Sequence, residues 1–129
     1  MRNLYERYER AFADRDPPFA FVDLDAVGAN ADSMLADARG KPIRLASKSV
    51  RCRPLLRQLL DRSEGFQGLL NFTLPEALWL YGHGYRNLVV AYPWPGRSAL
   101  RSLAEVTAED PDGAPAVMLD CAEHLDLLQ

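Results

Sequence analysis

The sequence predicts an α/β protein with parallel strands, and three observations support this. Apolar runs of strand length alternate four times with amphipathic segments of helix length. The apolar runs are almost uninterrupted, as is typical of strands that are covered on both faces. Successive runs begin about 20 to 30 residues apart, a repeat that suits a (β/α)8 (TIM) barrel or a doubly wound sheet. We expect about the first four βα units of a barrel.

The length of the chain bears on how much of a barrel it forms. It has 129 residues, whereas a complete (β/α)8 barrel needs roughly 250. We therefore expect the N-terminal part of a longer protein, with residues 41–129 forming the first half of the barrel. Residues 1–40 would precede it as a helix and a strand-helix segment. A self-contained open sheet of four units is the alternative.

The segment before the repeating units predicts two helices with one strand between them. Apolar residues at helical spacing predict a helix from Leu4 to Phe12, capped by Asn3 and ended by the prolines that follow Asp16. A strand is expected over 19–25. Asp25 would then cap a helix through residue 38, and Gly40 would close it.

Four strand–helix units are expected in the remainder of the chain. Their strands are predicted over 42–48, 68–72, 87–92 and 116–120, and their helices over 54–62, 73–84, 98–106 and from 121 onward. The second helix has the strongest start, because Thr73 and Glu76 form a capping box around Pro75.

Composition excludes several classes of protein. A formal net charge of −3 gives no general reason to expect nucleic acid or an anionic membrane as a partner. The arginines of residues 51–62 follow helical spacing, which indicates a solvated helix face. No apolar run is long enough to span a membrane, and the N-terminus does not resemble a secretory signal, so a cytoplasmic protein is expected. The two cysteines and two histidines lack metal-ligand spacing, so no metal site is expected.

Lys48 is the main candidate for chemistry. Functional groups in parallel α/β folds gather at the carboxyl ends of the strands. Period two along strand 42–48 places Arg44, Ala46 and Lys48 on one face, so that Lys48 points inward at that end. A low-dielectric site depresses the pKa of a lysine and makes its neutral amine a nucleophile toward carbonyls. The pattern indicates a Schiff base with a substrate or with pyridoxal phosphate, and a solvated strand end is the alternative.

The stretch PFAFVDLDAVGANADSMLADARGKPIRLASKSVR resembles the opening of the alanine-racemase-type (fold type III) pyridoxal phosphate enzymes. The resemblance is strongest to the branch with D-threonine aldolase and D-serine dehydratase, and to bacterial amino acid deaminase/aldolase. These families begin with a proline-led apolar strand, an Asp-Leu-Asp segment and a helix bearing an asparagine. The matching residues are Pro18, Asp23, Leu24, Asp25 and Asn30. The similarity runs from about residue 17 to the end of the chain.

The next strand of these families carries an Arg-Pro-His-x-Lys-Thr-His-Lys type of motif, whose first lysine forms the internal aldimine. Arg44 and Lys48 fall on its arginine and reactive lysine, with Ser49 and Arg51 on the threonine and the second basic residue. The resemblance therefore implies that Lys48 holds pyridoxal 5'-phosphate as a Schiff base.

Three positions depart from that motif. Leu45 and Ala46 replace its Pro-His pair, and Val50 replaces its later histidine. The deaminase/aldolase subgroup, with an Arg-x-Ala-Ser-Lys-Ser-Val-Arg version, fits better than the aldolases. These departures put the substrate and the reaction in question.

Other residues are weaker candidates. Tyr92 would stack beside the cofactor's pyridine ring or hydrogen-bond near it, or would simply plug the barrel end. Arg44 lies roughly 13 Å from Lys48 at about 3.3 Å per residue, so we expect it to form an ion pair lower in the barrel, with Asp23, that keeps the cofactor site electropositive. Asp120 would reach the barrel mouth or, as is usual before a helix, cap that helix.

The resemblance implies a PLP-dependent amino acid lyase, a deaminase or aldolase acting on a hydroxy amino acid such as D-threonine or D-serine. It places the phosphate site and a divalent metal outside this chain and allows a homodimer. An alanine-racemase-type enzyme is one alternative, although those racemases carry a tyrosine closely after the lysine and SKSVRCRP has none. A non-enzymatic PLP-binding protein, an inactive fragment and an α/β interaction module without cofactor are the others.

Overall fold

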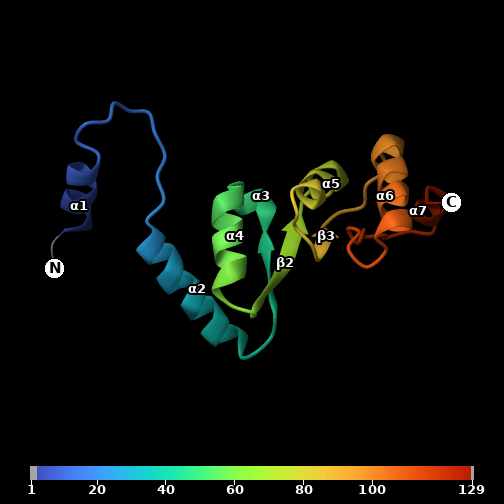
Figure 1. Ribbon diagram of the computed structural model, residues 1–129, viewed down its shortest axis with the longest axis horizontal. Coiled ribbons are helices and arrows are strands. Elements are labelled where there is room, and N and C mark those ends of the chain that lie inside the picture. The colour runs from blue at the N-terminus through green and yellow to red at the C-terminus, as the bar shows by residue number, and fades with distance from the viewer. Residues whose placement is uncertain (1–2, 129) are drawn as a thin grey trace.

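The computed structural model describes residues 3–128 and shows an α/β protein built on a three-stranded parallel sheet (Figure 1). The strands β1 (Ile43–Ala46), β2 (Phe66–Asn71) and β3 (Leu88–Val90) lie in the order β1-β2-β3. A helix lies in each connection between neighbouring strands. The prediction of parallel strands joined by helical crossovers is confirmed.

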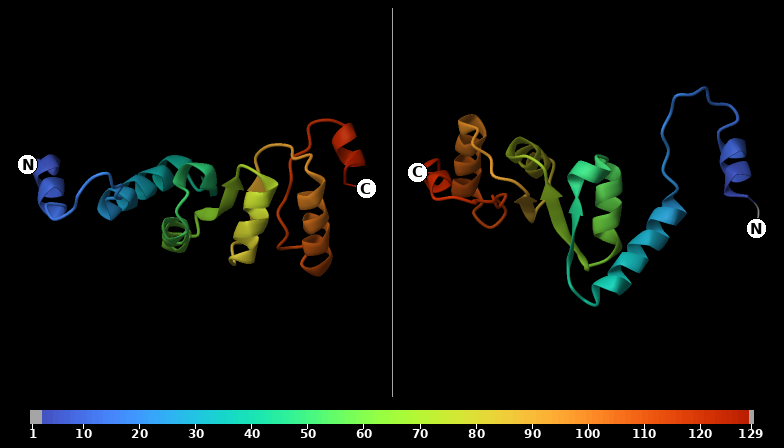
Figure 2. Two further views of the ribbon diagram at one scale, coloured as in Figure 1. Left: turned by 90° about the horizontal axis from the view of Figure 1, so that it is seen from above. Right: turned by 180° about the vertical axis from the view of Figure 1, so that it is seen from behind.

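Seven helices accompany the sheet in the described part of the chain. They are α1 (Leu4–Ala11), α2 (Leu24–Ala38), α3 (Ser47–Val50), α4 (Arg53–Arg62), α5 (Leu74–Gly82), α6 (Arg97–Glu109) and α7 (Glu123–Asp126). The elements follow one another along the long axis of the molecule, with α1 and α7 at opposite ends of it (Figure 1). Figure 2 shows that α1 and the segment after it project away from the sheet.

Two apolar clusters hold the sheet to its helices. The first joins the sheet to α4 and to the end of α5, with Leu56, Leu69 and Leu88 almost fully buried. The second joins α5 and α6 to β3, with Leu74 and Val90 inaccessible to solvent. Burial of such side chains from water is the main favourable contribution to folding. Helix α5 contributes to both clusters, with its first turn in the second cluster and its last turn in the first.

The capping prediction for α5 is confirmed. The Thr73 side chain accepts a hydrogen bond from the Glu76 amide at 3.3 Å, and Glu76 Oε2 accepts one from the Phe72 amide at 2.8 Å. The glutamate thus reaches back to the residue before the cap rather than to the cap itself. In α2 the cap is Asp23 and not Asp25, because Asp23 is the last extended residue and its carboxylate accepts two amides of the first turn.

The strand predicted over 19–25 is wrong. This segment runs as irregular chain into α2, and no strand among the described residues offers it hydrogen bonds. Its apolar side chains pack locally, with the rings of Phe19 and Phe21 centred 5.0 and 4.5 Å from that of Phe12. Its apolar pattern therefore reflects an aromatic cluster with α1.

The fourth predicted strand, 116–120, is reduced to one bridge. Ala116 pairs with β3, accepting from the Val90 amide at 2.9 Å and donating to the Leu88 carbonyl at 2.9 Å. The chain then leaves the sheet, and Met118 and Leu119 are exposed. A strand has to pair along its length, and within the described residues this one has a partner at a single position.

The first predicted strand ends two residues early. Strand β1 stops at Ala46, and Ser47 begins the one-turn helix α3 that carries Lys48. The predicted inward direction of Lys48 rested on the two-residue alternation of a strand. Because Lys48 lies in a helix, that alternation does not apply to it.

Candidate functional site

Three chain segments meet beyond the carboxyl end of the sheet. Helix α3 follows β1 directly, Phe72 follows β2, and Tyr92 lies two residues after β3. Because the three strands are parallel, these segments share one edge of the sheet, where ligands bind in open α/β folds. The structure thus brings Lys48 and Tyr92 together, as their positions at the carboxyl ends of the first and third parallel strands suggested.

The Lys48 amine lies in a corner formed by two aromatic rings. Its Nζ donates a 2.9 Å hydrogen bond to Tyr92 Oη and lies 5.7 Å from the centre of the Phe72 ring. The two rings meet edge to face with centres 5.4 Å apart. Phe72 and Tyr92 are both 47% exposed. The amine is therefore held by contacts of the kind that attract a cation, and the rings beside it still offer surface to a flat ligand.

A buried polar network lies beneath this corner. Ser47 Oγ donates to Glu76 Oε1 at 2.7 Å and accepts from Asn71 Nδ2 at 2.9 Å. Ser47 is 2% exposed and Asn71 is fully buried. Since Glu76 also accepts the Phe72 amide, the network ties the ends of β1 and β2 to the first turn of α5. Buried hydrogen bonds of this kind strengthen one another and favour a single local arrangement.

One atom of the network has no partner. Asn71 Oδ1 is buried and accepts no hydrogen bond from any residue that the structure describes. Leaving a buried acceptor unpaired costs free energy and is uncommon in native proteins. This acceptor lies on the last residue of β2, directly before Phe72.

Arg44 lies at the other end of the sheet. Its guanidinium donates to the backbone and side-chain oxygens of Asn87, at 2.5 and 2.6 Å, and Asn87 directly precedes β3. The separation from Lys48 was expected, but the predicted ion pair of Arg44 with Asp23 is wrong. Without a strand over 19–25, Asp23 does not reach the sheet.

Asp23 instead holds α1 against the start of α2. It accepts a 2.7 Å hydrogen bond from Tyr8 Oη, and its carboxylate lies 3.7 Å from the Arg7 guanidinium. The Tyr8 hydroxyl, and after it the Ala26 amide, lower the pKa of Asp23 below its ordinary value.

The basic zone around α4 is occupied by intramolecular contacts. Arg62 pairs with both oxygens of Asp32 at 2.8 and 2.7 Å, and Arg57 lies over the Tyr85 ring. Arg51 donates to the Lys48 carbonyl at 2.8 Å. The four arginines of this zone are nevertheless exposed, which agrees with the interpretation of residues 51–62 as a solvated helix face.

Sequence reasoning did not place Phe72, Asn71 or Glu76 in the site. A signal was available for Asn71, since it is a polar residue in the apolar run of β2 and is inaccessible to solvent. For Glu76 the helix cap was a sufficient explanation. Its second role, accepting a hydrogen bond from Ser47, depends on a residue that lies 29 positions earlier. Phe72 carried no signal beyond its position after a strand.

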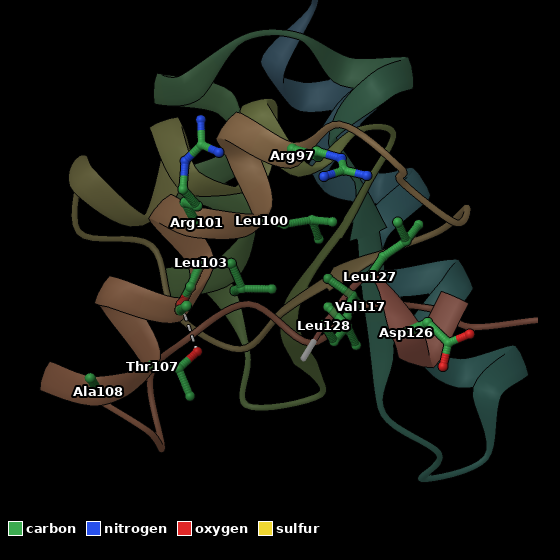
Figure 3. A pocket seen from close by; sticks show the side chains of 11 residues that line it. Arg97, Leu100, Arg101, Leu103, Thr107, Ala108, Val117, Asp126, Leu127 and Leu128 are labelled. Atoms are coloured by element: carbon green, nitrogen blue, oxygen red, sulfur yellow. Dashed lines mark hydrogen bonds between the residues drawn. The ribbon is translucent and has the colours of Figure 1, made fainter. Parts of the chain in front are cut away.

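One cavity of the molecule borders this site, and a larger groove lies away from it. The cavity, of about 450 Å³, is lined by Ser47, Arg51, Glu76 and Trp79, so it borders the polar network from the side of α4 and α5. A larger groove of about 800 Å³ lies between α6 and the C-terminal segment (Figure 3). No predicted site residue lines that groove, and its walls are mainly leucine and alanine.

Among residues 3–128, no helix combines the length and apolar character required to cross a bilayer. Comparisons of the chain with protein-family models, with curated proteins and with solved structures give no match.

Proposed function

We propose that this chain binds pyridoxal phosphate covalently through Lys48 and is part of an amino acid lyase. The observation that carries the proposal is the position of the Lys48 amine, which follows a parallel strand at its carboxyl end and lies 2.9 Å from Tyr92 Oη. The resemblance of residues 44–51 to the lysine motif of fold-type III enzymes supports the same assignment.

The residues around Lys48 suit such a ligand. The amine is half-buried and remains reachable, so its nitrogen can attack the cofactor aldehyde and form a carbon–nitrogen double bond with loss of water. The exposed rings of Phe72 and Tyr92 can stack on a flat heterocycle. When bound, pyridoxal phosphate supplies an electron sink for bond cleavage at the substrate Cα. Tyr92 Oη orients the lysine nitrogen and can hold or release a proton at that atom.

We infer further that the sheet belongs to a (β/α)8 barrel in the cytoplasm. Three parallel strands in sequence order support this, as does the Ala116 bridge on the outer side of β3. In that arrangement, the groups that hold the phosphate and any divalent metal of the lyase reaction lie outside this chain. The substrate is a small hydroxy amino acid such as D-threonine or D-serine.

Reductive trapping tests the covalent attachment. The chain has two lysines, Lys41 and Lys48, and Lys41 is exposed, so Lys41→Ala is a matched control. After incubation with pyridoxal phosphate and borohydride, peptide mapping should find the pyridoxyl group on Lys48. The label should disappear in Lys48→Ala and persist in Lys41→Ala. Equal labelling of both lysines, or none, would refute the proposal.

Product analysis then separates the reaction classes. The wild-type protein is loaded with pyridoxal phosphate and incubated with D-threonine or D-serine. Aldehyde, pyruvate and ammonia are then measured. Aldehyde indicates retro-aldol cleavage, while pyruvate with ammonia indicates deamination. Inversion at Cα without either product would identify a racemase, and labelling without turnover would identify a carrier.

A further inference from the structure

A second cluster of reactive side chains lies in the C-terminal segment, away from Lys48. Asp120, Cys121 and His124 bring one ligand atom each to within 4.8 Å of the others. Together they offer oxygen, sulfur and nitrogen, which are the ligand atoms that zinc takes in proteins. We propose that these three residues bind a divalent transition metal of the zinc class, with a fourth position open to water.

Helix capping does not account for Asp120. The sequence favoured a helix cap, but α7 has Ala122 at its N-cap and no side-chain capping hydrogen bond. The Asp120 carboxylate instead lies beside the His124 ring, with Oδ1 3.1 Å from Nδ1. Asp120 is thus directed toward the histidine.

The His124 ring nitrogen points to the same site. Nδ1 is buried yet makes no hydrogen bond with any described residue, even though Asp120 Oδ1 is only 3.1 Å away. A buried nitrogen without a partner is costly. The nitrogen and the carboxylate oxygen face one another at 3.1 Å, as two ligands of one cation would.

Cys121 supplies the atom that selects the metal. It is free and exposed, and thiolate with imidazole favours zinc, cobalt or copper over magnesium or calcium.

The geometry needs little adjustment to close around a metal. Bonds of about 2.0 to 2.3 Å in a tetrahedral site separate the ligand atoms by roughly 3.3 to 3.5 Å. The ligands lie within five consecutive residues, so closing the loop between them costs little entropy. Rotation of the exposed Asp120 and Cys121 side chains brings the present 4.8 Å spread into that range. With three protein ligands, we expect weaker and more exchangeable binding than at a closed four-ligand site.

Cobalt titration tests the site directly and independently of the Lys48 proposal. The reduced, tag-free chain is titrated with CoCl₂ without oxygen, and zinc is then added as a competitor. We expect one equivalent to bind with a thiolate-to-cobalt charge-transfer band that zinc abolishes. Cys121→Ser should remove the band, and His124→Ala or Asp120→Asn should weaken binding about tenfold or more.

The chain provides its own controls. Its other cysteine and histidine, Cys52 and His83, are both exposed, so Cys52→Ser and His83→Ala should leave the titration unchanged. Far-ultraviolet circular dichroism checks that each variant is folded. The proposal is overturned by a titration that does not saturate, by a band that survives Cys121→Ser, or by one that depends equally on Cys52.

Discussion

Lys48 Nζ donates a 2.9 Å hydrogen bond to Tyr92 Oη although 44 residues separate them in the chain. The contact joins the segment after β1 to the segment after β3, across the carboxyl end of β2. It positions the amine without burying it, because the tyrosine ring is itself half exposed. Tyr92 is therefore a positioning residue for Lys48. Substitution can show whether its hydroxyl or its ring is responsible.

Tyr92→Phe should slow or weaken covalent labelling of Lys48 about tenfold. The variant keeps the ring and removes one half-exposed hydrogen bond, which contributes about 0.5 to 1.5 kcal/mol, and about 1.4 kcal/mol corresponds to a factor of ten. The rate of borohydride-trapped labelling at several cofactor concentrations measures the effect. Tyr5→Phe is the control, since Tyr5 is exposed on α1. Identical labelling of Tyr92→Phe and wild type would mean that the hydroxyl does not position the amine.

Ser47→Ala should destabilise the fold by about 1 to 3 kcal/mol, because Asn71 Nδ2 and Glu76 Oε1 would each lose a buried partner. Ser49 lies on the same helical turn and is exposed, so Ser49→Ala should change stability by no more than about 0.5 kcal/mol. Urea denaturation of the two variants compares these positions. Equal midpoints would show that the polar network contributes nothing to stability.

Gly68→Ala should destabilise the chain more than Gly40→Ala. Both glycines have a φ of +81°, where an alanine costs about 1 to 2 kcal/mol. A Cβ on Gly40 meets nothing, whereas one on Gly68 meets the Asn87 carbonyl oxygen and lies 2.9 Å from Arg44 Nη1. The overpacking adds about 1 to 3 kcal/mol. Thermal denaturation ranks the variants, and the reverse order would contradict the close approach of β2 to Asn87.

Acidification should release α1 from the start of α2. The pKa of Asp23 is lowered by the Tyr8 hydroxyl first and then by the Ala26 amide, so the folded state binds fewer protons here than the unfolded state. The stabilisation is complete above the ordinary pKa of about 3.9 and is lost as the pH falls through the lower folded value. Nuclear magnetic resonance titration of the carboxyl carbon measures this pKa.

Tyr8→Phe provides the control for that titration. Removing the hydroxyl should move the Asp23 pKa back toward its ordinary value, and Asp23→Asn should remove the pH dependence while keeping a capping oxygen. A wild-type pKa at or above the ordinary value would contradict the contact.

Much of the architecture follows from local signals that the sequence carries. Asn3 before an amphipathic run predicts α1, Thr73 and Glu76 predict the start of α5, and the alternation of apolar and amphipathic segments predicts parallel strands. The errors concern pairing. Residues 19–25 and 116–120 have the composition of strands, but a strand forms only where another strand meets it, and composition does not contain that information.

The candidate site was predictable only where local sequence signals determine it. Lys48 and Tyr92 were found because both follow strands, and parallel strands bring their carboxyl ends together. The helical turn Ser47–Val50 was not found, because four residues are too few to show a period and no capping residue precedes them. The partners of Ser47 come from 24 and 29 residues away, so only the packed sheet reveals them.

Strand β1 joins helix α3 directly. The number of residues between Ala46 and Lys48 is therefore as important as the identity of the lysine. One extra residue between Ala46 and Lys48 would turn the lysine about 100° around the helix axis, away from Tyr92. Grafting this amine onto another protein therefore means transplanting the strand end and the turn together, with no spacer.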